Sequence, residues 1–416
     1  PLGRLTITIS NSRDAELRAR AARVIPGGMY GHQSVARLPE GYPQFFSRAE
    51  GCRLWDADGN EYIDYMCGYG PNLLGYRRAE VEEAARRQAE LGDAMTGPQG
   101  VMVELAERIT GAVSHADWAM FTKNGADSTN SAIQIARAYR GRNKILVAEG
   151  SYHGAAFWST PRPTGVPDED RSHLIRFRYN DIASLEAAAD KAGDDLAAIM
   201  VTAYKHDAMV DNAMVDAAFA RRCREIADAA DALLIVDEVR AGWRLSTDCS
   251  WSLVDVAPDM SAWGKVLANG HALSAHLGND RAREAASSIF ITGSYWFAGV
   301  SMAAALATMD VIEQEDVVGH VGRVGQMLRD GLAEQASRHG FDLRQTGPAQ
   351  MPQVLFANDP ERELGNAWCL ECLERGVYFH PWHNMFLSAA HTPEDITRTL
   401  EATDGAFAAL AARRAA

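Results

Sequence analysis

Short, continuously apolar runs alternate with amphipathic segments through the middle of the chain. Residues 144–148, 197–202 and 232–236 are rich in aliphatic side chains, which favours strands covered on both faces of a sheet. Residues 182–192 and 217–230 show the apolar spacing of amphipathic helices. This alternation predicts an α/β fold with a mostly parallel central sheet.

The two ends of the chain carry a different pattern. Residues 13–24 predict an early helix, and residues 54–65 predict two strands around an Asp-Gly turn. Residues 318–339 predict a long amphipathic helix, which short strands and helices follow. We therefore expect a large central domain and a small α+β domain made from both chain ends. The expected bounds are 61–314 for the large domain, and 1–60 with 315–416 for the small one.

Composition narrows the class of protein. The chain has 416 residues and a formal net charge of −14, so it offers no basic surface to a nucleic-acid backbone. No apolar run approaches the roughly 20 residues of a membrane helix. Six cysteines are too few for a disulfide scaffold and fit a reducing cytoplasm. Cys369 and Cys372 form one Cys-x-x-Cys pair, which we interpret as free thiols and not as a metal site.

The run Asn124-Gly125-Ala126 precedes a segment that predicts a helix to about Arg140. Small residues at the start of a helix let backbone N–H groups approach a phosphate, and the helix dipole favours the anion. The alternative is an ordinary helix cap at Asp127 or Ser128, with no ligand.

Two ionisable residues follow predicted strands further along the chain. Asp237 comes directly after an apolar strand, where a carboxylate needs a partner: a protonated pyridine nitrogen or a structural salt bridge. Lys265 lies among small and apolar residues, and a buried lysine loses its proton readily and attacks aldehydes. Ligands in open α/β sheets bind at the carboxyl ends of the strands, so these residues are candidates for one site.

In this order, a phosphate loop, a strand-end acid and a lysine 28 residues later form the layout of type I pyridoxal-phosphate (PLP) aminotransferases. The chain resembles the class III family, and within it the glutamate-1-semialdehyde aminomutases, from about Val24 to Phe407. Further shared runs are Pro26-Gly27-Gly28, 54–59 with 62–65, 149–154, 237–239 with Gly242 and Arg244, Gly264-Lys265, and 376–396.

The resemblance implies a role for each matching residue. Lys265 would hold PLP as a Schiff base and move a proton, and Asp237 would keep the ring nitrogen protonated. Tyr152 and Val239 would cover the two ring faces. The residues implied to bind the cofactor are Asn124, Gly125, Ala126, Tyr152, His153, Asp237, Val239, Lys265 and Ser294. Ser294 matches a turn that reaches the phosphate of a neighbouring subunit, so the resemblance also implies a homodimer.

The chain departs from the family where the substrate binds. The phosphate loop reads Asn-Gly-Ala in place of Ser-Gly-Thr, so a hydroxyl is lost. Ser34 stands where the aminomutase has a carboxylate-binding arginine, with Arg37 as a possible substitute, and residues 384–388 lack the second arginine of many class III enzymes. Losing both carboxylate contacts argues against a standard amino-acid substrate. The candidate substrate residues are Ser34, Arg37, Tyr69, Lys205 and Trp296, within a polar and aromatic set that includes His32, His206, His380 and His383.

We therefore expect a cytoplasmic, homodimeric PLP-dependent aminotransferase. It would move an amino group from a small-molecule donor to the carbonyl of a non-standard acceptor. A related aminomutase or racemase remains the first alternative, and a PLP-dependent decarboxylase or lyase the second. A non-enzymatic binding module is disfavoured, because a scaffold has no need for both Lys265 and Asp237.

Overall fold

The computed structural model describes residues 9–415 and has a seven-stranded sheet at its centre. The strand order is β4-β10-β9-β8-β7-β5-β6, and β10 runs antiparallel to β4 and β9 while the other neighbouring pairs are parallel. This confirms the expected α/β fold. The strands are β4 (Trp118–Thr122), β5 (Lys144–Ala148), β6 (Leu174–Phe177), β7 (Leu196–Thr202), β8 (Leu233–Asp237), β9 (Met260–Trp263) and β10 (Ser274–Gly278).

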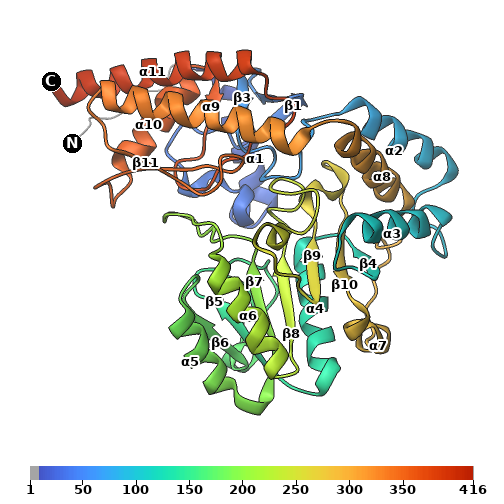
Figure 1. Cartoon of the computed structure of the whole chain (residues 1–416). Helices are drawn as coiled ribbons and strands as arrows, with labels where there is room; N and C mark the ends of the chain where they lie inside the picture. Colours follow the sequence, from blue (N-terminus) through green and yellow to red (C-terminus); the bar gives the residue numbers. More distant parts are fainter. Residues whose placement is uncertain (1–8, 416) are drawn as a thin grey trace.

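Helices cover both faces of this sheet (Figure 1). On β8, Leu234 and Val236 belong to the apolar cluster that includes α6, whereas Leu233 and Ile235 belong to the cluster that includes α4. Successive side chains point to opposite faces of a strand, so a strand buried on both sides must be apolar throughout. The helices that cover the two faces are α4 (Gly125–Arg140), α5 (Ile182–Ala192), α6 (Ala217–Ala229) and α7 (Asp280–Ser288).

A second, four-stranded sheet joins segments from both ends of the chain. Its order is β1-β2-β3-β13, with β13 parallel to β3. The strands are β1 (Phe46–Glu50), β2 (Arg53–Asp56), β3 (Glu61–Asp64) and β13 (Val377–Tyr378), and a separate hairpin pairs β11 (Leu343–Thr346) with β12 (Gln353–Phe356). The helices α9 (Val317–Arg338), α10 (Glu363–Glu374) and α11 (Pro393–Ala415) lie beside this sheet, with α1 (Ser12–Val24) below them in Figure 1.

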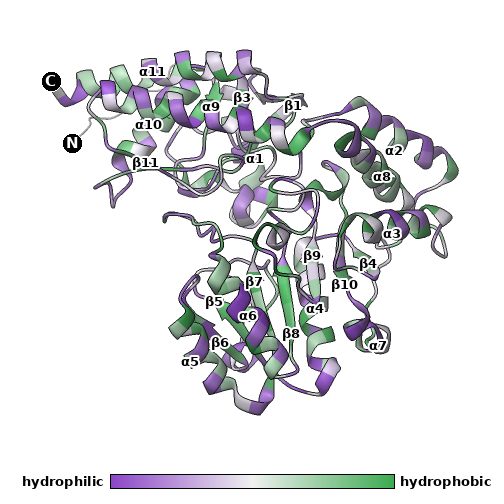
Figure 2. Cartoon of the chain, viewed as in Figure 1, coloured by the Kyte–Doolittle hydropathy of each residue, from purple (hydrophilic) through white to green (hydrophobic). Residues whose placement is uncertain are grey.

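Three further helices form a group at the side of the central sheet, near β4 and β10 (Figure 1). They are α2 (Ala79–Leu91), α3 (Gly100–Ala112) and α8 (Gly299–Gln314). Figure 2 shows β8 in the apolar colour, whereas the helices around the sheet mix polar and apolar residues. The apolar core therefore lies between the layers, and the carboxyl ends of the parallel strands face the second sheet.

The predicted elements agree with the structure to within a few residues. The helix predicted at 182–192 is α5, and those predicted at 217–230 and 318–339 are α6 and α9. The hairpin predicted within 54–65 is β2 and β3. All six cysteines are buried free thiols. Across residues 9–415, none of the helices has the length and apolar character needed to cross a bilayer. The domain bounds at 60 and 314 stay predictions.

Arg244 ties the C-terminal segment to the central domain. Its side chain is buried, its Nη1 donates to the Leu387 carbonyl oxygen at 2.8 Å, and its Nη2 donates to the Gly70 carbonyl oxygen. Its guanidinium also lies 4.9 Å from the ring centre of Phe386. These contacts hold residues 384–388 against the loop that contains Tyr69, above the carboxyl ends of the strands.

Close packing between β10 and β4 gives a first prediction. A Cβ atom added at Gly278 would lie 2.2 Å from Trp118 Cζ2, so Gly278→Ala should lower the melting temperature, at a cost of about 1–3 kcal/mol. Gly111→Ala in α3 is the matched control, because its Cβ would meet nothing within 4 Å, and a helical alanine is favoured over glycine by up to about 1 kcal/mol. Equal losses in thermal denaturation of the two variants would contradict this account.

Candidate active site

Three neighbouring strands of the central sheet end at the same edge. Thr202 of β7 pairs with Asp237 of β8, and Asp237 pairs with Ala262 of β9. The chain leaves these strands through residues 203–207, 238–240 and 264–268. The register of the sheet therefore brings Asp237 and Lys265 to one place, as the sequence predicted.

Lys265 follows β9 and begins a short 3-10 helix. Its backbone is left-handed, with φ 46°, and its Nζ donates a hydrogen bond to the Tyr69 carbonyl oxygen at 2.7 Å. Burial lowers the pKa of Lys265 to about 7; the nearby Arg240 and Arg244 guanidiniums act in the same direction, and Asp237 opposes them. A substantial fraction of the amine is therefore uncharged near neutral pH, the form that attacks an aldehyde.

The Asp237 carboxylate is buried, and both of its oxygens accept hydrogen bonds. Oδ1 accepts from the Val239 N–H at 3.0 Å, and Oδ2 lies 2.7 Å from His153 Nδ1. His153 Nε2 is itself buried without a hydrogen-bond partner among residues 9–415. A buried carboxylate oriented in this way suits a protonated ring nitrogen, so Asp237 fits the position that the sequence assigned to it.

The start of α4 differs in one detail from the sequence interpretation. Asn124 caps the helix, whereas the alternative to a phosphate loop was an ordinary cap at Asp127 or Ser128 with no ligand. The Asn124 N–H donates to Asp127 Oδ2 at 2.8 Å, so Asp127 is the third helical residue of a capping box. The first N–H groups of a helix have no partner within it, so those of Gly125 and Ala126 can meet an anion.

Two close contacts pack this helix start against the other predicted cofactor residues. A Cβ atom added at Gly125 would lie 2.6 Å from Val239 Cγ1, and one added at Gly154 would lie 2.6 Å from Ala126 Cβ. The phosphate-loop candidates, Val239 and the segment that carries Tyr152 and His153 are thus contiguous. Tyr152 is 41% exposed at this surface, where its ring is available to a ligand.

The candidate substrate residues divide into two groups. Tyr69 lies beside Lys265, and its hydroxyl donates to the His32 carbonyl oxygen at 2.7 Å. Its ring makes edge contacts with His32 and His383, with centroids 4.7 and 5.5 Å away. Tyr69 and these histidines therefore form one cluster around the amine.

The other candidates contact residues other than Lys265. The Ser34 hydroxyl accepts from the Ala36 N–H at 3.4 Å, and Arg37 is exposed on the same short helical turn. Lys205 exchanges backbone hydrogen bonds with Ala213 at 2.8 and 3.0 Å. Ser294 is exposed, and the Trp296 indole covers Gly293. Within residues 9–415, neither Ser294 nor Trp296 forms a hydrogen bond with Lys265, whose amine donates to Tyr69.

The sequence interpretation missed Arg240. Its Nη1 donates to the His206 carbonyl oxygen at 3.2 Å and to Asn384 Oδ1 at 2.5 Å. Burial lowers the pKa of Arg240, and its charge in turn lowers the pKa of Lys265 and His206. A cation three residues after a strand-end acid was a visible signal, but the run shared with the family passes from Val239 to Gly242 and Arg244 without including Arg240.

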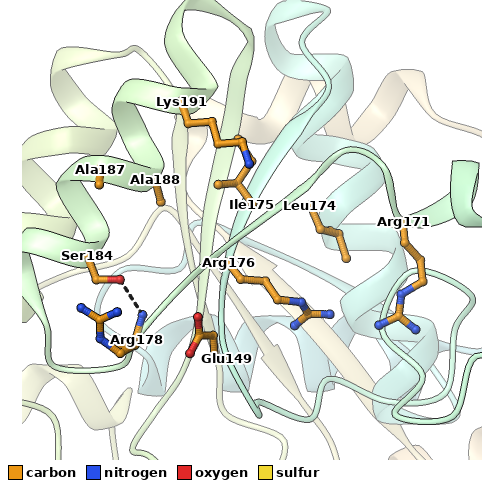
Figure 3. A pocket seen from close by; sticks show the side chains of 10 residues that line it. All are labelled: Glu149, Arg171, Leu174, Ile175, Arg176, Arg178, Ser184, Ala187, Ala188 and Lys191. Atoms are coloured by element: carbon orange, nitrogen blue, oxygen red, sulfur yellow. Dashed lines mark hydrogen bonds between the residues drawn. The ribbon is translucent and has the colours of Figure 1, made fainter.

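A separate cavity of about 590 Å³ lies away from this site, between β6 and α5 (Figure 3). Four cations and one acid are among its lining residues: Arg171, Arg176, Arg178, Lys191 and Glu149. None of the predicted site residues lines it. Its position beside the outermost strand β6 separates it from Asp237 and Lys265.

Known proteins with similar sequences are aminotransferases and aminomutases. The chain is 53% identical over 401 residues to the aminopentol aminotransferase of Sphingopyxis macrogoltabida, covering 96% of this chain and 95% of that protein. It is 32% identical over 435 residues to the glutamate-1-semialdehyde 2,1-aminomutase of Desulforamulus reducens, covering 97% and 99%.

A solved structure has nearly the same fold as this chain and the same level of sequence identity as the first relative. The PLP internal aldimine form of the FumI protein from Sphingopyxis sp. MTA144 has a TM-score of 0.96 and 53% identity, covering 97% of this chain and 98% of that chain. The chain therefore has the type I fold of PLP-dependent transferases, and PLP is its cofactor. Asp237, the start of α4 and the Lys265 amine fit the ring nitrogen, the phosphate and the aldehyde of this group.

The lowered pKa of Lys265 gives a second prediction. Capture of PLP by the apoenzyme needs the uncharged amine, so its initial rate should rise as the pH passes through about 7. Borohydride reduction followed by peptide mass spectrometry measures the PLP fixed at Lys265, and Lys265→Ala supplies the background. A midpoint near the pKa of about 10.4 of a free lysine would overturn this account of the amine.

Residues 36–394 match the Aminotransferase class-III family. This span includes both sheet-edge residues, Asp237 and Lys265, together with the start of α4. The chain belongs to the class-III aminotransferase family and is a PLP-dependent aminotransferase.

Proposed function

We propose that this aminotransferase takes its amino group from a polyhydroxylated amine of the aminopentol type. The identity of 53% with an aminopentol aminotransferase supports this donor class. The chemistry of the pocket supports it as well, since tyrosine and histidine side chains cluster beside Lys265, and both family positions for a carboxylate-binding arginine, at Ser34 and within residues 384–388, lack one.

The observation that carries the proposal is a cluster of uncharged imidazoles near Lys265. Burial lowers the pKa of His206 and His383 well below the usual range and that of His380 to about 3. Arg240 also disfavours a charge on His206 and His383. A neutral imidazole has one hydrogen-bond donor and one acceptor, which suits a hydroxyl group. Several of them can bind the hydroxyl groups of a polyol.

We assign each residue of the site a role in binding PLP or in moving a proton. PLP, when bound, supplies the aldehyde that condenses with amines and a ring that withdraws electrons. We assign Asp237 to the ring nitrogen, the N–H groups of Gly125 and Ala126 to the phosphate, and Tyr152 and Val239 to the ring faces. The Lys265 Nζ takes the proton from the carbon that bears the amino group and returns it during transfer. His153 holds the Asp237 carboxylate in place.

An aminomutase is the second candidate, because relatives with that activity are 32% identical. Aminotransfer is favoured by the higher identity to an aminotransferase and by Ser34, which stands where the aminomutase has its arginine. The Ser34 hydroxyl is engaged with the Ala36 N–H and carries no charge. A mutase would form product without a second substrate, so omission of the acceptor separates the two activities.

We also propose a homodimer. Phe290 and Tyr295 are 86% and 70% exposed on the loop between α7 and α8, which also carries Ser294. This loop ends beside the loop after α2, since the Val300 N–H at the start of α8 donates to Asp93 Oδ1 at 2.8 Å. Two exposed aromatic rings on one loop suit a subunit interface. We place the enzyme in the cytoplasm, which the free thiols of its six cysteines support.

The donor class gives the third prediction. The PLP enzyme should convert to its pyridoxamine form, followed by absorbance, with aminopentol and far less efficiently with L-glutamate, whose side-chain carboxylate would meet neutral histidines. A 2-aminoalkane of the same chain length, without hydroxyl groups, is the control and should be intermediate. Preference for L-glutamate would refute the proposed donor.

The interface gives the fourth prediction. Phe290→Asp with Tyr295→Asp should place like charges across a dimer interface, so the protein should shift toward monomer in light scattering and lose PLP more readily. Val24→Asp on α1 is the control, because Val24 is also exposed, at 80%, but lies outside these loops. An unchanged mass for the double variant would argue against this interface.

A further inference from the structure

Arg240 is a half-buried guanidinium in the active site with neutral hydrogen-bond partners. Nη1 contacts the His206 carbonyl oxygen and the Asn384 side-chain oxygen, and the Tyr204 hydroxyl lies close by. Among residues 9–415, no carboxylate forms an ion pair with Arg240. Removing a cation from water is costly unless an anion compensates for it, so an arginine kept in this position suits an anionic ligand.

Two carboxylates, Asp237 and Asp207, act on Arg240 through their charge but form no ion pair with it. Asp237 is held by His153 and by the Val239 N–H. Asp207 lies beside Gly150, where a Cβ atom would come within 2.7 Å of its Oδ2. The charge of Arg240 also acts on Lys265, His32, His206 and His383, and desolvation together with this charge lowers the pKa of all three histidines. Neither acid therefore pairs directly with Arg240, and its guanidinium keeps its charge available to an anionic ligand.

The Asn384 side chain that holds Arg240 comes from a segment that binds substrate carboxylates in many class III enzymes. Residues 384–388 lack the arginine that many class III enzymes use for a carboxylate, and Asn384 of this run instead holds Arg240 from across the site. An aminotransferase must bind two substrates in one pocket. A polyol amine can use the neutral imidazoles, but an acceptor that carries a carboxylate needs a cation.

We propose that Arg240 binds the carboxylate of a 2-oxo acid that accepts the amino group. This rests on the proposed function. Over the full cycle the donor exchanges its C–N bond for C=O, and the acceptor exchanges C=O for C–N. The donor carbon loses two electrons and the acceptor carbon gains them, so no further oxidant or reductant is required. Arg240 is a specificity residue and takes no part in proton transfer.

The test compares 2-oxobutanoate with propanal, which has hydrogen in place of the carboxylate. The enzyme is first brought to its pyridoxamine form, and the rate of return to the PLP form is followed by absorbance at several acceptor concentrations. Arg240→Met should reduce the selectivity for 2-oxobutanoate over propanal by at least about tenfold, the size expected for a lost charge-assisted contact. Arg240→Lys should recover part of it, because charge returns without the planar fork.

A binding measurement separates this inference from the proposed function. Butanoate carries the carboxylate but has no carbonyl to react, so calorimetry on the PLP enzyme should show binding that Arg240→Met removes. Arg176→Met is the matched control in the distant cationic cavity of Figure 3, and should bind butanoate like the parent protein.

Each outcome has one meaning. Unchanged selectivity in Arg240→Met, or equal loss of butanoate binding in Arg176→Met, would overturn the role of Arg240. Failure of aminopentol to form the pyridoxamine enzyme would refute the proposed donor alone, because pyridoxamine phosphate added to apoenzyme still permits the acceptor comparison.

Discussion

A lysine amine that must be uncharged near neutral pH is the constraint on which this site depends. Burial and the guanidiniums of Arg240 and Arg244 disfavour the protonated form of Lys265, while Asp237 limits the effect. The Tyr69 carbonyl oxygen then fixes the direction of the amine. The same surroundings keep the nearby histidines neutral, so one electrostatic arrangement sets both the reactivity of the amine and the hydrogen-bonding character of the pocket.

The central sheet and the C-terminal segment provide this arrangement together. Parallel register places the ends of β7, β8 and β9 side by side, which brings Asp237 and Lys265 to one edge. Arg244 then binds carbonyl groups from both chain regions, at Gly70 and Leu387. Because Gly70 follows Tyr69, a structural arginine also positions the acceptor of the lysine hydrogen bond.

Much of this organisation could be predicted from sequence because it depends on local patterns. Apolar runs identified β5, β7 and β8, and the order of loop, acid and lysine identified Lys265 and Asp237. The pairing of His153 with Asp237 joins residues 84 apart, and no local pattern encodes such a contact. Arg240 was missed because residues in a loop follow no period. The alternative of an ordinary cap named Asp127 or Ser128 and not Asn124, because all three residue types favour the cap position.

The contact between Ala126 and Gly154 has a consequence for how this sequence can vary. Gly154 has φ 102°, and a side chain there would collide with Ala126. The family's threonine at position 126 would add a hydroxyl and a methyl group to this crowded surface. The two positions are therefore coupled: during divergence or directed evolution, position 154 must stay glycine for the segment that carries Tyr152 and His153 to remain packed against the start of α4.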